Sequence, residues 1–214
     1  MGSEMCIRDS SNAALQTVKR LYQAKKAGHT GSLDPLASGL LPICLGEATK
    51  LSGLLLNADK TYRFTCRLGV TTTTGDAEGE IIASRPVGSL DRARIDAALR
   101  QFVGPIQQIP PMYSAVKRDG QPLYKLARRG IEVERAPREV TVHELRLLRQ
   151  DAEELECELR CSKGTYVRTL AADLGAALGC GGHVSALRRI AVEPYDAARM
   201  IALEALRECA ERGG

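Results

Sequence analysis

Apolar residues recur every three or four positions in several parts of the chain, which places them on one face of a helix. The first such stretch carries Leu15, Val18 and Tyr22 on one face, behind Ser11 and Asn12 as candidate N-caps. The glycine at position 28 can stop this helix. The same spacing predicts helices over about 47–57, 89–103 and 168–178 and from about 200 onward, with a short basic helix that ends at 130.

Strict alternation of apolar and polar residues predicts strands elsewhere. The clearest case is 61–68, whose apolar face consists of Tyr62, Phe64, Cys66 and Leu68. Further strands are expected near 81–82, 139–148, 155–161 and 184–192. Strands and helices are interspersed without a regular βαβ rhythm. We therefore predict an α+β fold with a mixed, largely antiparallel sheet flanked by helices and loops.

Composition narrows the class of protein. The 214 residues are enough for one large domain or two small ones. No apolar run approaches the roughly 18 residues of a membrane span, and no signal peptide is evident. The seven cysteines are scattered and contain no Cys-x-x-Cys, so we expect reduced thiols and a cytoplasmic protein. The three histidines share no ligand spacing with them, so no metal site is expected.

The charge distribution indicates an anionic partner. The net charge is only +4, but residues 117–138 contain seven basic and three acidic residues. Residues 160–189 contain five basic residues and one acidic residue, whereas 144–158 are strongly acidic. A fold that gathers the two basic segments would present a cationic face, which is typical of nucleic-acid binding.

The segment 28–50 carries the most informative chemistry. Its glycines permit sharp bends, its leucines can anchor it to a core, and Asp34 precedes Pro35, which favours an extended backbone. Taken alone, an Asp-Pro in such a loop more often forms a structural turn in which the carboxylate binds nearby amides. A phosphate-binding loop is excluded, because no lysine follows a glycine at the required spacing.

Five ordered motifs together resemble one known family. They are His29-Thr30-Gly31-Ser32-Leu33-Asp34-Pro35 with Gly46-Glu47-Ala48-Thr49-Lys50, Asp59-Lys60-Thr61-Tyr62-Arg63, Gln108-Ile109-Pro110-Pro111-Met112-Tyr113-Ser114-Ala115, Cys161-Ser162-Lys163-Gly164-Thr165-Tyr166-Val167-Arg168-Thr169, and Gly181-Gly182-His183-Val184 with Leu187-Arg188-Arg189. This set resembles the TruB family of bacterial tRNA pseudouridine synthases, from residue 11 to the end of the chain.

The resemblance implies an isomerase that converts the uridine at position 55 in the tRNA T loop to pseudouridine. The uridine would be flipped out, its glycosidic bond broken, and its C5 joined to the same sugar. The resemblance implies tRNA as the partner, through its T arm, and no cofactor, metal or membrane; we expect a monomer. The alternative is a tRNA-binding or tRNA-folding protein on the same scaffold that does not catalyse the reaction.

The resemblance also implies roles for three catalytic residues. Asp34 matches the catalytic aspartate of the family, and Arg168 matches the arginine that pairs with that carboxylate. Tyr62 matches the tyrosine that packs on the target base. Without the resemblance, Arg168 would be taken as a surface arginine near a helix start and Tyr62 as a core residue.

Substrate-binding roles follow in the same way. His29 matches a histidine that inserts into the T loop, and Tyr166 and Leu187 match residues that enclose the base. Lys50 is a candidate phosphate contact. Further candidates for phosphate contacts are Lys60, Lys163, Arg188 and Arg189.

The ends of the chain depart from the family pattern. Residues 1–10 match neither helix nor strand periodicity and stand where the family has its first strand, so we expect a leader without structure and an exposed sheet edge. The catalytic domain is expected over 11–214, without the small C-terminal RNA-binding domain of the family.

Overall fold

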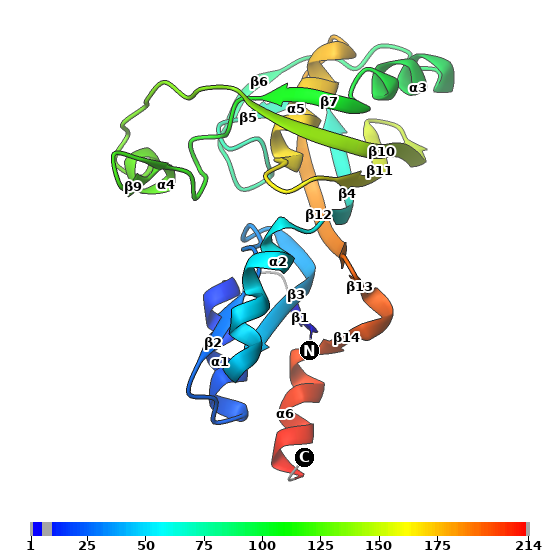
Figure 1. Ribbon diagram of the computed structural model, residues 1–214. Helices are drawn as coiled ribbons and strands as arrows, with labels where there is room; N and C mark the ends of the chain where they lie inside the picture. The colour runs from blue at the N-terminus through cyan, green and yellow to red at the C-terminus, as the bar shows by residue number, and fades with distance from the viewer. Residues whose placement is uncertain (1, 6–9, 213–214) are drawn as a thin grey trace. The chain divides into compact units, whose positions relative to one another are not determined.

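The computed structural model describes residues 2–5 and 10–212 (Figure 1). The chain divides into two compact units. Unit one consists of Met1–Arg63 and Ala186–Gly214, and unit two of Phe64–Ser185. Strands β4 (Lys60–Leu68) and β12 (Gly182–Val192) each begin in one unit and end in the other.

Unit one is built on a small mixed sheet. Its strands follow the order β14 (Met200–Ala202), β1 (Gly2–Met5), β3 (Ala37–Leu45) and β12. Strand β1 pairs antiparallel with β3 and parallel with β14, and β3 runs parallel to β12. Two short strands pair antiparallel at the sides: β2 (Ala27–His29) on β3, and β13 (Tyr195–Asp196) on β12.

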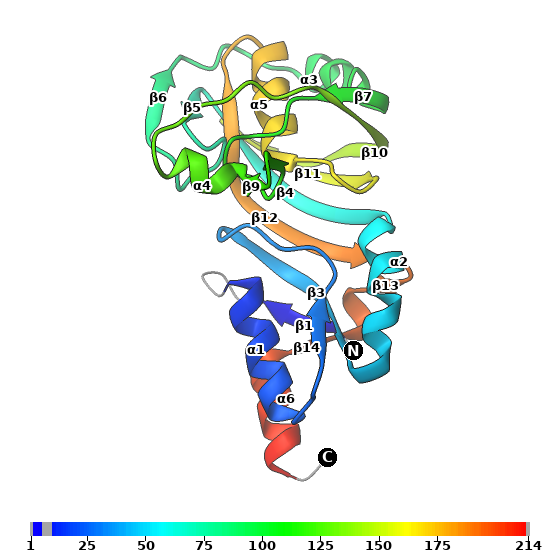
Figure 2. The same ribbon diagram turned by 60° about the vertical axis from the view of Figure 1, so that its left-hand side comes forward.

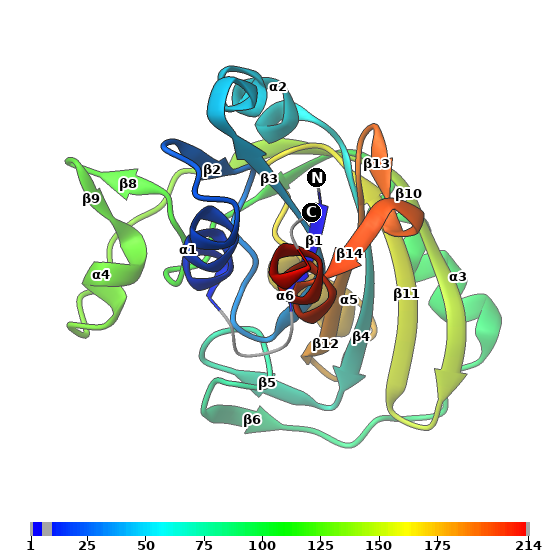
Figure 3. The same ribbon diagram turned by 90° about the horizontal axis from the view of Figure 1, so that it is seen from below.

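Helices cover both faces of β3. Helix α1 (Ser11–Leu21) begins at Ser10, whose side chain accepts a hydrogen bond from the main-chain N–H of Ala13. Figure 2 shows α1 on one side of β3 and α2 (Ser52–Asn57) on the other. The remaining helical elements are the 3₁₀ helices η1 (Gly46–Leu51) and η2 (Ala197–Arg199), and α6 (Leu203–Glu211), which packs beside α1 (Figure 3).

The structure corrects the expectation for residues 2–5. They form β1, whose register places Met5 opposite Gly39 and Gly2 opposite Pro42. The expectation of no strand here is therefore wrong, and the expected open edge beside β3 is covered. A four-residue strand held by main-chain hydrogen bonds leaves no side-chain pattern to detect. Residues 6–9 lie outside the described residues, so the expectation for them stays a prediction.

Unit two contains the longer antiparallel strands. Its sheet order is β12, β4, β11 (Glu154–Cys161), β10 (Arg138–Asp151) and β7 (Gly104–Gln108). Strand β10 is antiparallel to both β11 and β7. The other elements of this unit are β5 (Val70–Thr72), β6 (Ile81–Ser84), α3 (Arg92–Arg100), β8 (Lys117–Arg118), β9 (Gln121–Pro122), α4 (Leu123–Ala127) and α5 (Val167–Ala177).

The core of unit two lies between its sheet and α5. On β4, Phe64, Cys66 and Leu68 are buried, as the alternation predicts. The Cys66 thiol donates to the carbonyl oxygen of Ala171 on α5 at 3.6 Å, so helix and strand are in contact. The buried face of α5 includes Leu170 and Leu174. This packing fixes the start of α5, where Tyr166 and Arg168 stand.

The predicted α+β class with a largely antiparallel sheet is confirmed. One central element differs from the expectation: the glycine-rich pattern places residues 37–45 in a loop, but they form β3. Strand β3 is buried along nearly its whole length. A strand covered on both faces forms a continuous apolar run, and this one also contains a glycine and a proline.

The packing of β3 against β12 gives a first testable prediction. Gly39 has φ +102°, and a Cβ added there would lie 2.2 Å from the main-chain oxygen of Arg189. Gly39→Ala is therefore expected to lower the free energy of unfolding by about 3 kcal/mol, through backbone strain and overpacking. Urea denaturation measures this. The matched control is Gly53→Ala in α2, where a Cβ would meet open space, and it should be neutral or stabilising. Equal effects of the two would contradict the prediction.

Candidate active site

The residues to which sequence analysis gave a role divide between the two units. Unit one contains His29, Asp34, Lys50, Tyr62 and Leu187, and unit two contains Tyr166 and Arg168. The contacts of each of these residues are therefore those inside its own unit.

Asp34 lies on an ordered loop, residues 30–36, which joins β2 to β3 and is called the Asp34 loop below. The N–H of Leu33 donates to the Ser11 hydroxyl at 2.8 Å, which ties the loop to the start of α1. The carbonyl oxygen of Asp34 accepts from the N–H of Ala37 at 2.8 Å, so a turn leads into β3. Asp34 itself is half-buried. The loop thus presents a partly accessible carboxylate on a fixed backbone.

Arg189 does not have the exposed position of a phosphate contact. It is 1% exposed, and its Nε donates to the carbonyl oxygen of Leu40 at 2.8 Å. Its Nη2 donates to the carbonyl oxygen of Gly31 at 3.1 Å. The expected phosphate contact at Arg189 is therefore wrong. The sequence could not reveal this, because nothing in the pair Arg188-Arg189 says which side chain faces inward.

Lys60 is also buried rather than available to RNA. It is 7% exposed, and its Nζ donates to the carbonyl oxygens of Leu56 at 2.9 Å and Ala58 at 2.6 Å. These carbonyls belong to the C-terminal end of α2, where a cation is favoured by the helix dipole. Lys60 therefore caps α2, and the expected phosphate contact there is wrong.

His29 stands at the end of β2, immediately before the Asp34 loop. The side chain is half-buried, and its Nδ1 is buried with no hydrogen-bond partner among the residues that the structure describes. Burial, and secondly the charge of Arg189, lower the pKa of the imidazole from 6.5. His29 is thus biased toward the neutral form.

This bias predicts a specific pH dependence of stability. Because the pKa of His29 is lower in the folded chain, the unfolded chain binds the proton more readily. The contribution to stability is complete above the unfolded value of 6.5 and is lost as the pH falls through the folded pKa. The free energy of unfolding of His29→Gln should therefore drop less than that of wild type between about pH 7.5 and pH 5. Equal drops in urea titrations at the two pH values would contradict this.

The other three residues of unit one have different environments. Leu187 on β12 is 8% exposed and stands opposite Ala37, the first residue of β3, which places it beside the end of the Asp34 loop. Tyr62 on β4 is half-buried. Lys50 is exposed and forms an ion pair with Glu47, so it remains accessible to an anion.

In unit two, Arg168 joins three segments at the start of α5. It is 4% exposed, and its Nη1 donates to the carbonyl oxygen of Thr74 at 3.1 Å. Nη2 donates to the carbonyl oxygen of Tyr113 at 2.8 Å. Nη1 also lies 3.6 Å from the Asp76 carboxylate. These contacts orient the guanidinium and show that it is not an ordinary surface arginine.

Asp76 is the functional candidate that the sequence did not single out. It is 4% exposed in the loop between β5 and β6. Its Oδ1 accepts hydrogen bonds from the Thr74 hydroxyl at 2.5 Å and from the N–H of Glu78 at 3.1 Å. The other carboxylate oxygen, Oδ2, is the one near Arg168. Asp76 is a single aspartate among threonines and glycines, and no local pattern marks it, because its partner Arg168 lies far along the chain.

Tyr166 is held by its main chain. The buried side chain of Gln108 accepts from the N–H of Tyr166 at 2.9 Å and donates to its carbonyl oxygen at 3.2 Å. Gln108 ends β7, so this amide links the sheet to the residue before α5. The Tyr166 side chain is half-buried and remains partly accessible.

The double hydrogen bond of Gln108 gives another prediction. Gln108→Ala would leave the N–H of Tyr166 without this partner, while its carbonyl oxygen keeps the N–H of Leu170, at a cost of about 1–3 kcal/mol in free energy of unfolding. We expect urea denaturation to show this loss. The neighbouring Gln107→Ala is the matched control, because Gln107 is exposed on the same strand. A Gln108 variant as stable as the control would contradict the prediction.

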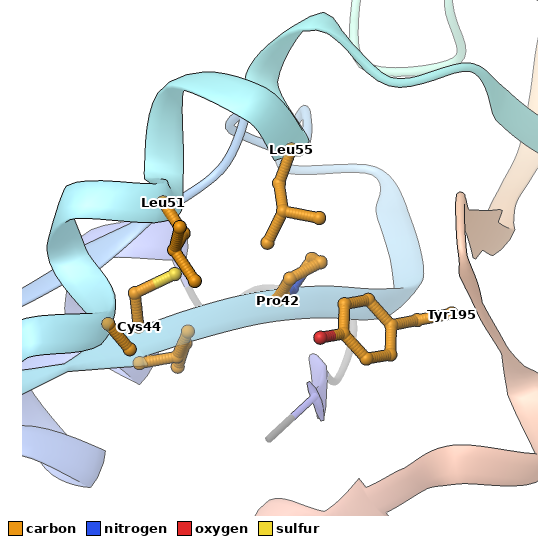
Figure 4. Close-up of a pocket in the computed structure, with 7 residues that line it drawn as sticks. Pro42, Cys44, Leu51, Leu55 and Tyr195 are labelled. Carbon is orange, nitrogen blue, oxygen red and sulfur yellow. The ribbon is translucent and has the colours of Figure 1, made fainter.

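The apolar cavity of unit one is separate from these residues. It measures about 80 Å³ and is lined by Pro42, Ile43, Cys44, Ala48, Leu51, Leu55 and Tyr195 (Figure 4). No titratable group except the Cys44 thiol and the Tyr195 phenol lines it, so it offers no carboxylate for catalysis. It lies between β3, η1 and α2 and is open to solvent, since Leu51 in its lining is 56% exposed.

Burial raises the pKa of the Cys157 thiol to about 12 and also raises that of Cys66, which makes both poor nucleophiles. Within residues 2–5 and 10–212, no cluster of three His, Cys, Asp or Glu side chains suits a metal ion. In the same part of the chain, no helix is long and apolar enough to cross a membrane.

Comparison with known proteins bears on both parts of the chain. Residues 19–167 match the TruB family pseudouridylate synthase N-terminal domain, and residues 168–212 match the tRNA pseudouridylate synthase B C-terminal domain. The second match covers part of the region that sequence analysis assigned to one catalytic domain over 11–214. That assignment therefore stays a prediction.

Curated relatives and solved structures agree with these matches. The chain is 63% identical over 202 residues to tRNA pseudouridine synthase B of Nitrosococcus oceani, covering 94% of this chain and 66% of the relative. It is 60% identical to the protein of that name in Chromohalobacter salexigens, covering 93% and 65%. The chain thus spans slightly less than two thirds of these relatives.

Among solved structures, a chain in a Cbf5–Nop10–Gar1 complex superposes with a TM-score of 0.77 at 28% identity, covering 97% of this chain and 53% of that one. A chain of an archaeal box H/ACA Nop10–Cbf5 complex has a TM-score of 0.73 at 24% identity, covering 99% and 53%, and shows the same fold. The family models and the solved structures thus agree on the fold that carries the Asp34 loop and Arg168. The chain belongs to the TruB family of pseudouridylate synthases.

Proposed function

We propose that the chain isomerises the uridine at position 55 in the T loop of tRNA to pseudouridine. The observation that carries this proposal is the half-buried carboxylate of Asp34, held on a loop that is anchored to α1, β3 and Arg189. Family membership supports it, and the relatives named above are called tRNA pseudouridine synthases. The reaction is expected to take place in the cytoplasm.

The reaction balances without an oxidant, an energy donor or a metal. The bond from ribose C1′ to N1 of uracil breaks, the base rotates, and a bond from C1′ to C5 forms. C5 then loses its proton and N1 gains one. Asp34 is proposed to act at C1′, by covalent attack or by stabilising a glycal-like intermediate. Tyr62, half-buried on β4, is proposed to pack on the uracil ring.

Arg168 is proposed to complete the catalytic group. In unit two its guanidinium is fixed by Thr74, Asp76 and Tyr113. A fixed cation next to Asp34 would favour the ionised carboxylate and orient it toward the sugar. Asp76 would then act through Arg168 as a positioning residue.

Base extrusion needs groups that fill the vacated space and enclose the flipped uracil, because flipping costs a few kcal/mol. His29 is proposed to enter the T loop as a neutral imidazole, and Tyr166 and Leu187 to enclose the base. Lys50, which is exposed, is proposed to contact an RNA phosphate. Two further candidates for phosphate contacts are accessible: Lys163 is exposed and Arg188 is half-buried.

The proposal is tested by tritium release from tRNA labelled at uridine C5. Wild type should release one tritium per tRNA, and chemical mapping should place the pseudouridine at position 55. The control transcript carries cytidine at that position and should release none. Tight, salt-dependent binding of tRNA with no release under any condition would overturn the proposal and favour the non-catalytic tRNA-binding alternative.

A further inference from the structure

The guanidinium of Arg189 joins the chain on both sides of Asp34. Nη2 donates to the carbonyl oxygen of Gly31, inside the Asp34 loop and three residues before the carboxylate. Nε donates to the carbonyl oxygen of Leu40 in β3, six residues after it. Both bonds are of ordinary length, 3.1 and 2.8 Å, and lie within unit one. One planar group thus fixes the separation between the start of the loop and β3.

The main chain of Arg189 contributes to the same arrangement. Arg189 stands opposite Gly39 in the parallel register of β12 and β3. The approach is so close that a Cβ at Gly39 would lie 2.2 Å from the Arg189 carbonyl oxygen. The main chain of Arg189 therefore packs against β3, and its side chain donates a hydrogen bond to the Asp34 loop.

The charge of Arg189 is unusual for a purely structural residue. The side chain is 1% exposed, yet within the described part of unit one no carboxylate lies within ion-pair distance of it. Burying a cation among carbonyl groups, with no carboxylate beside it, is costly. Filling this space does not by itself require a charged guanidinium with several N–H donors, so its hydrogen bonds to the loop and to β3 are the feature to explain.

We propose that Arg189 is a positioning residue for Asp34. It holds the Asp34 loop in the geometry that catalysis requires and makes no contact with the RNA. This inference rests on the isomerase activity proposed above. A lysine could not fully replace it, because a single ammonium nitrogen cannot reproduce the two separated donors of a guanidinium.

The test compares Arg189→Met and Arg189→Lys with wild type in the full chain, using single-turnover tritium release and tRNA binding. Misplacing a catalytic carboxylate by about 1 Å costs about a hundredfold in rate, so the methionine variant should lose about that factor. Its dissociation constant for tRNA should stay within about twofold, because Arg189 does not reach the surface. The lysine variant should recover about tenfold of the lost rate, as one donor is restored.

Hydrogen exchange separates loop positioning from general destabilisation. In Arg189→Met, amides in residues 30–41 should exchange faster, while those in residues 155–161 of β11 keep the wild-type rate. Arg100→Met, which removes an exposed arginine at the end of α3, is the matched control and should leave rate and exchange unchanged.

Three results would overturn the inference. The first is an unchanged rate in Arg189→Met, and the second is weaker tRNA binding that accounts for the whole loss, as for a phosphate contact. The third is equal loss in both variants with faster exchange throughout the chain, as for a purely structural residue. If wild type itself releases no tritium, the proposed function fails; faster exchange confined to 30–41 would then show that the loop contact exists without catalysis.

Discussion

Asp34→Asn is expected to reduce pseudouridine formation by about a thousandfold or more, because the amide can neither attack C1′ nor carry the negative charge that stabilises the intermediate. The substitution keeps the shape of the side chain. The loop is held by Ser11, Ala37 and Arg189 through main-chain groups, so it should remain folded. Single-turnover tritium release measures the rate, and filter binding measures the affinity for tRNA.

The control for this experiment is binding. Asp34→Asn should bind tRNA with nearly the wild-type dissociation constant, since phosphate contacts supply most of the affinity. Release of tritium at the wild-type rate would show that Asp34 is not the catalytic carboxylate. Asp34 would then have only the structural role in a turn that the sequence of its loop favours when taken alone.

The second large effect is expected at the buried ion pair of unit two. Asp76→Ala removes the carboxylate near Arg168 and the acceptor for Thr74 and Glu78. Removing one partner of a buried pair costs about 3 kcal/mol or more, so urea denaturation should show a loss of that size. The rate of pseudouridine formation should also fall by about a hundredfold, because Arg168 loses part of its orientation.

An exposed pair provides the matched control. Asp96 pairs with Arg92 on the surface of α3, and Asp96→Ala should cost less than about 1 kcal/mol and leave the rate unchanged. The double variant Asp76→Ala/Arg168→Met should be less destabilised than the sum of its single changes. Additive losses would show that the two side chains do not act together.

The elements that sequence predicts well are those with one buried face. Strand β4 shows the alternation expected of it, and α5 lies within one residue of its predicted bounds. Strand β3 was not recognised because both of its faces are covered, which removes alternation. Strand β1 depends on main-chain pairing with β3 and β14, which no local pattern encodes.

The candidate site was predictable only in part. Its motifs identified Asp34 and Arg168 through resemblance to a family, whereas their residue types alone favoured structural roles. The positions of basic side chains were not predictable: Lys60 and Arg189 are buried and donate to carbonyl groups, and Lys50 is exposed. Asp76 was missed because its partner Arg168 lies on a distant segment of the chain.

We propose that Asp34 and Arg168 act together on a flipped uridine. A crystal structure of the chain bound to a T-arm stem-loop measures this directly. We expect a hydrogen bond of about 3 Å between the Asp34 carboxylate and the Arg168 guanidinium, with the ribose of the flipped uridine against Asp34. A bound RNA whose target uridine stays stacked, or a complex in which Asp34 and Arg168 are too far apart for any contact, would contradict it.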